Sequence, residues 1–271
     1  MRPVTLRAPT PREPTGGDAL FDVRDRVALV TGASSGLGEH FAGMLASRGA
    51  RVIAAARRAD RLEALVARIR AAGGVATAIA MDVTSAESVA AGIAKGTADL
   101  GPLDLVVNNA GVASTKASLE LTEADWRGVL DTNLDGAWRV AQASAKAMVA
   151  AGRPGSIVNI ASILGLRVAA QLLAYATAKA ALVQLTKALA LEWARHGIRV
   201  NAIAPGYIQT DMNREFFATP AGQAVVKRIP QRRIGQPADL DGALLLLASA
   251  AGDFMTGSII AVDGGHVVNS L

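Results

Sequence analysis

Short runs of consecutive hydrophobic residues alternate along the chain with longer stretches in which hydrophobic residues recur every three or four positions. Uniformly apolar runs are typical of strands covered by helices on both faces, and the longer stretches have the period of amphipathic helices. Strands are expected at residues 27–30, 51–56, 75–81, 103–107, 156–160, 199–204 and 259–262. Because strands and helices alternate over short connections, the pattern predicts an α/β fold with a doubly wound parallel sheet and helices on both of its faces.

Local signals place the helices between these strands. Asp60 precedes Glu63 by three residues, which is the spacing of an N-cap residue and its capping-box partner. Helices are expected at residues 39–47, 123–148 and 175–195, and after the capping residues Asp60 and Ser85.

The N-terminal segment differs from the rest of the chain. Its first 20 residues contain four prolines and three arginines but few hydrophobic residues, so residues 1–22 are expected to form a flexible arm. Glu13 and Asp18 argue against a transit peptide, which is poor in acidic residues. No second compositional block follows, and residues 23–271 are expected to form a single domain.

Composition narrows the class of protein. The 271 residues include no cysteine, which excludes disulfide scaffolds and thiolate sites, and the three histidines are too scattered to suggest a metal site. Lys and Arg outnumber Asp and Glu by 28 to 23, but the basic residues are dispersed and only 4% of residues are aromatic. A nucleic-acid partner is therefore not expected. Without a signal peptide or a membrane span in the sequence, we expect a cytoplasmic protein with no membrane partner.

A glycine-rich turn follows the first expected strand. Gly32, Gly36 and Gly38 follow a Gly-x3-Gly-x-Gly pattern and lead into a helix. Glycines allow a tight turn and close approach of a ligand, and a helix N-terminus offers free N–H groups to a pyrophosphate. No Gly-Lys-Ser/Thr sequence follows, which disfavours a P-loop kinase. The turn therefore predicts a nucleotide cofactor.

Further motifs follow in order along the chain. They are Asp82-Val83, Asn108-Asn109-Ala110-Gly111, Asn133, Ser162, Tyr175-x3-Lys179, Pro205-Gly206 and Asp263-Gly264-Gly265. Together with the glycine-rich turn, this set resembles the short-chain dehydrogenase/reductase family over about residues 25–267. The resemblance implies a Rossmann-like fold and an NAD(P)-dependent oxidoreductase that moves a hydride between the nicotinamide and a secondary alcohol or ketone.

The residues of the Tyr-x3-Lys motif are expected to act together. Tyr175 and Lys179 are neighbours on one helix face, and an ammonium about 4 Å from a phenolate contributes about 4 kcal/mol at an effective dielectric of about 20. We therefore expect Lys179 to lower the pKa of Tyr175 toward neutral pH. The resemblance implies that Tyr175 is the general acid/base, Ser162 binds the reacting oxygen, and Asn133 positions a water that links Lys179 to solvent.

The end of the second strand bears on the choice of cofactor. Ala56 stands where NAD-preferring relatives carry Asp, and Arg57 and Arg58 follow, whereas Asp60 is expected to be structural. Arginine pairs well with a 2′-phosphate, so NADP(H) is the expected preference, mainly through Arg57 with Arg58 assisting, and NAD(H) is possible. The expected cofactor-binding residues are Gly32, Ser34, Ser35, Gly36, Leu37, Gly38, Arg57, Arg58, Asp82, Val83, Asn109, Ala110, Gly111, Tyr175, Lys179, Pro205, Gly206, Ile208 and Thr210.

The substrate pocket is expected between residues 112–115, 163–173 and 207–228, with the last segment forming a lid. Its expected lining is Ile163, Leu164, Val168, Leu172, Tyr207, Met212, Phe216 and Phe217. A small alcohol or carbonyl compound of the sugar or polyol type, or a general ketone, is the first candidate substrate.

Two alternatives remain open at this stage. A 3-oxoacyl thioester reductase would need a basic surface for a carrier protein, for which the candidates are Arg167, Lys227, Arg228, Arg232 and Arg233. A catalytically silent nucleotide-binding sensor is the other alternative. The resemblance also implies a homotetramer, assembled through the long helices 123–148 and 175–195 and the C-terminal segment.

Overall fold

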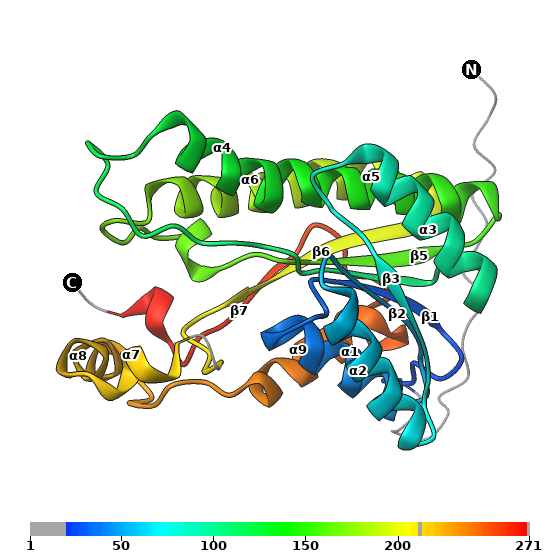
Figure 1. Cartoon of the computed structure of the whole chain (residues 1–271), viewed down its shortest axis with the longest axis horizontal. Helices are drawn as coiled ribbons and strands as arrows, with labels where there is room; N and C mark the ends of the chain where they lie inside the picture. The colour runs from blue at the N-terminus through cyan, green and yellow to red at the C-terminus, as the bar shows by residue number, and fades with distance from the viewer. Residues whose placement is uncertain (1–19, 211–212, 270–271) are drawn as a thin grey trace.

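The strands form one parallel seven-stranded sheet in the order β3-β2-β1-β4-β5-β6-β7 (Figure 1). The computed structural model describes residues 20–210 and 213–269. The strands are β1 (Val27–Thr31), β2 (Arg51–Ala56), β3 (Val75–Ala80), β4 (Leu105–Asn108), β5 (Gly155–Ile160), β6 (Ile198–Pro205) and β7 (Ile259–Val262). The predicted doubly wound, Rossmann-like fold is confirmed.

Helices cover both faces of the sheet because successive strand residues point to opposite sides. In β1, Ala28 and Val30 pack into one core, whereas Val27 and Leu29 pack into the other. The first core also takes residues from α1 (Gly36–Ser47), α2 (Ala59–Ala71) and α9 (Asp241–Ala248). The second takes residues from α3 (Ala86–Leu100), α5 (Gly136–Ala150) and α6 (Leu173–Trp193) (Figure 1).

The strand order reverses direction between β1 and β4. The chain leads from β1 outward to β3, then returns to β4 on the other side of β1 and continues to β7. Connections that leave the carboxyl ends of β1 and β4 therefore diverge, which opens a crevice of the kind that holds ligands in doubly wound proteins.

Helix boundaries differ from the predictions at several places, and the helix predicted at 175–195 is α6 (Leu173–Trp193). The helix predicted at 39–47 begins at Gly36, and α2 begins after Arg58, so Asp60 lies in its first turn and is not the N-cap residue. The predicted continuous helix 123–148 is divided into α4 (Glu123–Leu130), a π-helical turn (Asp131–Asp135) and α5. Ser85 caps α3 as predicted, since its side chain accepts a hydrogen bond from the Ser88 N–H.

The end of the predicted N-terminal arm contacts the fold. The Leu20 carbonyl accepts a hydrogen bond from the Ala251 N–H, and the Asp22 carboxylate pairs with Arg24. Residues 1–19 of that arm lie outside the described residues.

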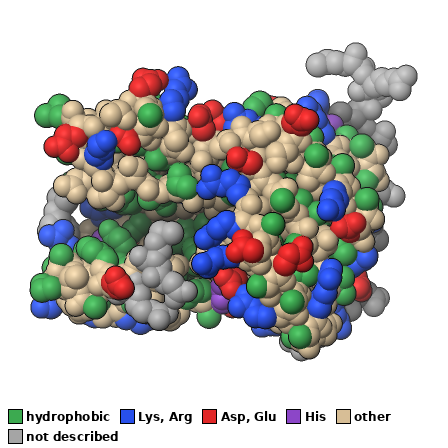
Figure 2. Space-filling model, viewed as in Figure 1, with side chains coloured by type: hydrophobic (Ala, Val, Ile, Leu, Met, Phe, Trp, Pro, Cys, Tyr) green, Lys and Arg blue, Asp and Glu red, His purple; other side chains and the backbone are tan. Residues whose placement is uncertain are grey.

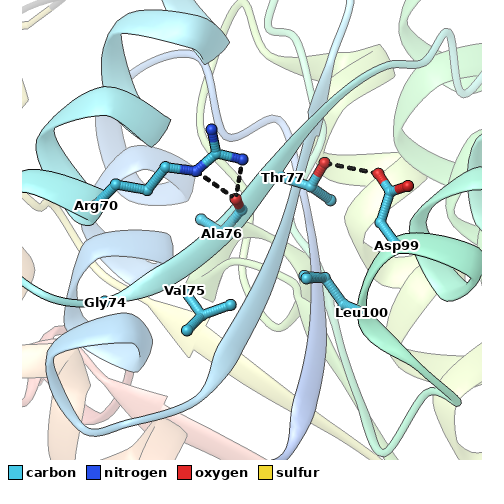
Figure 3. Close-up of a pocket in the computed structure, with 7 residues that line it drawn as sticks. All are labelled: Arg70, Gly74, Val75, Ala76, Thr77, Asp99 and Leu100. Atoms are coloured by element: carbon cyan, nitrogen blue, oxygen red, sulfur yellow. Dashed lines mark hydrogen bonds between the residues drawn. The ribbon is translucent and has the colours of Figure 1, made fainter.

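The open edge of the sheet at β3 has a surface pocket of about 400 Å³ at the amino end of the strand (Figure 3). Arg70 donates from Nε and Nη2 to the Ala76 carbonyl at 3.1 and 2.8 Å, and the Thr77 hydroxyl donates to Asp99 at 2.8 Å. This pocket lies away from the carboxyl ends of the strands, where the sequence motifs are found. Among the helices of the described ranges, none is both long and apolar enough to cross a membrane.

Candidate active site

The glycine-rich turn at the end of β1 requires its glycines. Gly32 and Gly36 have φ angles of +68° and +58°, which L residues rarely adopt. A Cβ on Gly38 would lie 2.3 Å from the Gly32 carbonyl oxygen, so the first turn of α1 packs directly against the loop. The Ser35 side chain makes no capping bond, and the N-terminal N–H groups of α1 are therefore not engaged by a side-chain cap. This is the geometry expected for binding a pyrophosphate.

Thr31 joins this turn to the loop that follows β4. Its hydroxyl accepts hydrogen bonds from the N–H groups of Asn109 and Ala110 at 3.0 and 3.1 Å, and its carbonyl accepts one from Asn109 Nδ2 at 3.0 Å. Thr31 was not among the predicted site residues. Thr31 begins the motif Thr31–Gly38 that resembles the family, but a buried Thr at the end of a strand gives no sign of these hydrogen bonds.

The two arginines after β2 differ in their surroundings. Arg58 donates to the Ser34 hydroxyl at 3.2 and 3.0 Å and to the Ser35 hydroxyl at 2.7 Å, which joins it to the glycine-rich turn. Arg57 is exposed, and its charge helps to lower the pKa of Asp82. The structure thus gives Arg58 the direct contact with the phosphate-binding turn, although the sequence argument assigned the larger role to Arg57.

Asp82 lies just beyond β3 as an ionised acceptor. Hydrogen bonds from the N–H and hydroxyl of Thr84, at 2.9 and 2.8 Å, lower its pKa. The next residue, Val83, is buried, and its side chain packs against Gly136 at the start of α5, where a Cβ would lie 2.8 Å away. Both residues therefore line the carboxyl edge of the sheet on the side of β3.

Ser162, Tyr175 and Lys179 come together at the carboxyl end of β5 and the first turns of α6. Lys179 is 4% exposed, donates to the Ile160 carbonyl at 2.7 Å, and lies with its Nζ 5.7 Å from the centre of the Tyr175 ring. The Ser162 side chain lies near enough to the Tyr175 hydroxyl to act on its pKa, and its hydroxyl accepts from the Leu164 N–H at 3.1 Å. The predicted catalytic group of these three residues is thus assembled in the folded chain.

Burial has the largest effect on the pKa values of Tyr175 and Lys179. Desolvation lowers the pKa of Lys179 to about 8 and raises the pKa of Tyr175, while the Ser162 side chain lowers the Tyr175 pKa in part. Lys179 was expected to lower the pKa of Tyr175, but the pKa of Tyr175 is raised. The physical reason is that the ammonium is directed at the Ile160 carbonyl and the phenolate would lose its hydration.

Asn133 lies in the π-helical turn and is almost fully buried. Its side-chain oxygen accepts from the Val112 N–H and its side-chain nitrogen donates to the Val112 carbonyl, both at 2.8 Å. The amide therefore ties the π-helical turn to the loop after Gly111, and the water that Asn133 is expected to position stays a prediction. It positions the loop that forms one wall of the expected substrate pocket.

Two further buried polar side chains tie the central strands together. Asn108 at the end of β4 donates to the Ala137 carbonyl at 2.6 Å and to Asn159 Oδ1 of β5 at 3.2 Å. Asn159 in turn donates to the Thr186 hydroxyl on α6 at 2.9 Å. These bonds fix β4, β5 and α6 to one another beneath the reacting residues.

The segment after β6 closes the other side of the crevice. Gly206 passes so close to the start of the turn after β7 that a Cβ would lie 2.7 Å from the Asp263 Cα. Ile208 pairs with Gly235, and the Thr210 methyl group would be 3.8 Å from a Cβ on Gly36. Thr210 is therefore beside the glycine-rich turn.

Beyond Thr210 lies the expected lid, which contains α7 (Arg214–Ala218) and α8 (Pro220–Arg228). Figure 2 shows a hollow between this segment and the layer that carries α4 and α6, with hydrophobic side chains on its floor and Lys and Arg side chains along its rim. The predicted lining is only partly realised, because Ile163 and Phe217 are buried while Val168 is 88% exposed. Met212 lies outside the described residues.

His266 is a neighbour of the pocket that the sequence analysis did not identify. Its ring centre lies 5.4 Å from that of Tyr207, which packs edge-on against Phe217 at 5.8 Å. His266 could not be identified from the sequence, because a single His near the C-terminus has no other candidate site residue at the spacing of a known motif. Within the described part of the chain, no group of three or more His, Asp or Glu could hold a metal ion.

The chain is similar to known proteins over most of its length. The family model described as enoyl-(acyl carrier protein) reductase matches residues 32–267. A galactitol 2-dehydrogenase (L-tagatose-forming) from Cereibacter sphaeroides is 40% identical over 252 residues, which cover 92% of this chain and 98% of that protein.

Two solved structures show the same arrangement of elements. A short-chain type dehydrogenase/reductase from Mycobacterium marinum has a TM-score of 0.86 at 42% identity and covers 91% of this chain and 97% of its own. A gluconate 5-dehydrogenase from Burkholderia cenocepacia J2315, in complex with NADP and tartrate, has a TM-score of 0.89 at 37% identity, covering 93% and 99%.

Proposed function

Because this chain belongs to the short-chain dehydrogenase/reductase family, we propose that Ser162, Tyr175 and Lys179 carry its reaction. The protein is an NAD(P)-dependent oxidoreductase that acts on a secondary alcohol or the corresponding ketone. The finer proposal is a sugar-like polyol or sugar acid as substrate. The relatives that act on galactitol and gluconate support it. The observation that carries the reaction type is that Ser162, Tyr175 and the buried Lys179 lie together, at the same sheet edge as the phosphate-binding turn.

Each of the three side chains has a distinct task. The nicotinamide of the bound cofactor supplies or accepts the hydride. The Tyr175 hydroxyl donates a proton to the carbonyl oxygen during reduction and takes one back during oxidation, while the Ser162 hydroxyl binds the same oxygen. Since burial raises the Tyr175 pKa, the phenol is protonated at neutral pH and is set to act as the proton donor. Lys179 keeps positive charge beside the ring.

The contacts of the basic residues weaken the alternative of a 3-oxoacyl thioester reductase that binds a carrier protein. Of the five basic residues proposed for such a surface, Arg167 donates to carbonyls of the C-terminal segment, Arg232 to the Lys227 carbonyl and Arg233 to the Asp239 carboxylate. Their guanidinium groups have internal partners, which favours a small substrate over a docked carrier protein.

A substrate screen tests the proposed reaction. Galactitol, gluconate and an acetoacetyl thioester are offered with NADP(H) and NAD(H), and the absorbance of the reduced nicotinamide is followed. Turnover of the polyol or the sugar acid supports the proposal. Turnover of the thioester alone would support the carrier-linked alternative, and cofactor binding without any turnover would support the sensor.

The second part of the proposal is a preference for NADP(H), based on Arg58 at the serine hydroxyls, exposed Arg57 and the absence of an acidic side chain at Ala56. We expect Arg57→Ala and Arg58→Ala each to lower NADP(H) affinity about 10- to 150-fold, because a charge-assisted hydrogen bond contributes about 1.5–3 kcal/mol. Affinity for NAD(H) should change little.

The matched control is Arg61→Ala, an exposed arginine one turn further along α2, which should leave both affinities unchanged. The measurement is fluorescence titration of each variant with both reduced cofactors. A higher kcat/KM with NAD(H) than with NADP(H) in the unmodified protein would contradict the preference.

A further inference from the structure

The C-terminal turn His266–Val268 lies beside α7 and contacts the segments on both sides of the substrate hollow (Figure 1). The turn is held in place by Asp263, whose carboxylate oxygens accept from the N–H groups of Gly265 at 2.9 Å and Val267 at 2.6 Å. Gly264 and Gly265 have φ angles of +64° and +88°, which allow the chain to fold back at this point. The turn is therefore a defined structure and presents its carbonyl groups in fixed directions.

On one side, the turn is bound by Arg167. The guanidinium Nη1 donates to the carbonyl of Val267 at 2.7 Å and to that of Asn269 at 3.3 Å. Arg167 is five residues beyond Ser162, and its own N–H donates to the Ile163 carbonyl at 2.8 Å, so the intervening chain is a compact turn. A displacement of Arg167 is thus transmitted over a short distance to the loop that carries Ser162.

On the other side, the turn is bound to the expected lid. Asn269 Nδ2 donates to the carbonyl of Arg228, the last residue of α8, at 2.8 Å. The His266 ring packs on Tyr207, and Tyr207 packs on Phe217 of α7. The C-terminal turn therefore joins α7 and α8 to the Ser162 loop across the substrate side of the site.

We propose that Arg167 is a positioning residue: by binding the C-terminal turn, it sets the spacing between the Ser162 loop and the α7–α8 segment, and so sets the affinity for substrate. Its contacts are to backbone carbonyls of residues 267 and 269, which leaves the proton-transfer group untouched. The effect should therefore fall on substrate binding and not on the chemical step or the cofactor.

The test compares Arg167→Ala and Asn269→Ala, which break opposite sides of the same connection, in the full chain saturated with NADP⁺. Hydrogen exchange of the amides in residues 214–228 should become about 3- to 10-fold faster in both variants, because the segment loses a connection that resists its opening. With galactitol or gluconate, KM should rise about 3- to 10-fold while kcat stays within about 2-fold. Arg167→Lys, which keeps a donor, should recover part of the loss.

The matched control is Arg70→Ala, which also removes an arginine from a backbone carbonyl, but at the far edge of the sheet. It should change neither the exchange of residues 214–228 nor KM. The kinetic readout rests on the proposed function, whereas hydrogen exchange does not, so a failure of the substrate assignment leaves this test intact.

Three results would overturn the inference. If hydrogen exchange in residues 214–228 is unchanged in both variants, the C-terminal turn does not hold this segment in place. A loss confined to Arg167→Ala and to the anionic substrate would show that Arg167 binds substrate directly. A parallel fall in Tm and in NADP⁺ affinity would show a general structural role.

Discussion

Tyr175 lies where burial favours the neutral phenol, and Ser162 lies beside its hydroxyl. Tyr175→Phe keeps the ring and removes only the transferable proton. We expect turnover to fall at least about 100-fold, since general acid–base catalysis contributes about 10²–10⁴-fold. NADP(H) affinity should change little, and steady-state kinetics with fluorescence titration measure the two quantities. Retention of more than about a tenth of the activity would exclude Tyr175 as the acid/base.

Lys179 makes the stability of the protein depend on pH. Its pKa of about 8 in the folded chain lies below the ordinary value of 10.5, so the unfolded chain binds more protons between these two values. The free energy of unfolding should therefore rise from about pH 8 to pH 10, by on the order of 2 kcal/mol. The gain is lost as the pH falls back through 8. Above pH 10 the raised pKa of Tyr175 acts in the opposite direction.

Denaturant unfolding of the cofactor-free protein at several pH values checks this dependence. In Lys179→Met the rise between pH 8 and pH 10 should disappear, because the group that titrates has been removed. An equal rise in that variant would assign the effect to other residues.

At the scale of single residues, the sequence located the reacting group but not its surroundings. Ser162, Tyr175 and Lys179 were identifiable because their spacing belongs to a set of ordered motifs. The contacts of Arg58 with Ser34 and Ser35, and the commitment of Asn133 to Val112, depend on side-chain directions that spacing does not encode. The raised pKa of Tyr175 depends on burial, which also follows only from the packed fold.

At the scale of elements, the first turn of α1 packs closely against the glycine-rich turn. Two glycines of this helix test that packing, because one lies in the contact and the other lies outside it. Gly38→Ala would place a Cβ 2.3 Å from the Gly32 carbonyl oxygen, whereas no atom of the described residues lies within 4 Å of a Cβ on Gly43. We expect Gly38→Ala to lower NADP(H) affinity at least about 10-fold by displacing the phosphate-binding turn. Gly43→Ala should keep the affinity and stabilise the helix by about 0.5–1 kcal/mol.

Cofactor titration and thermal unfolding of both variants measure these effects. Equal cofactor affinity in Gly38→Ala and the unmodified protein would mean that the turn adapts to the added methyl group. The glycine-rich turn would then not be the rigid phosphate-binding structure that its close contacts indicate.

The strands were predictable because each is a nearly continuous apolar run that ends in turn-forming residues. The division of the helix at 131–135 was not, since the residues Asp-Thr-Asn-Leu-Asp carry no marker that separates a π turn from an α turn. The cap assigned to Asp60 failed for a different reason. The helix begins one residue earlier, at Ala59, so Asp60 lies in its first turn, where a negative charge also favours the helix.

For the whole molecule, we expect a homotetramer. Hydrophobic side chains remain exposed on the outer helices, with Trp138 41% and Val149 46% exposed on α5 and Leu191 83% exposed on α6. Association through these helices would remove that surface from water. Light scattering should give a mass near four times the 27.8 kDa of one chain, and Trp138→Glu should lower it. A single-chain mass for the unmodified protein in dilute solution would contradict the expectation.

The contact between Arg70 and the Ala76 carbonyl has a consequence for solubility. No strand of the described residues lies beside the outer edge of β3, and an open sheet edge is a template on which a foreign strand can add. With two guanidinium donors on its oxygen, Ala76 is closed to an incoming backbone N–H, and the charge opposes the approach of an apolar chain. The arginine therefore closes one acceptor of this edge to strand addition, at the end of the sheet opposite to the one where substrate is bound.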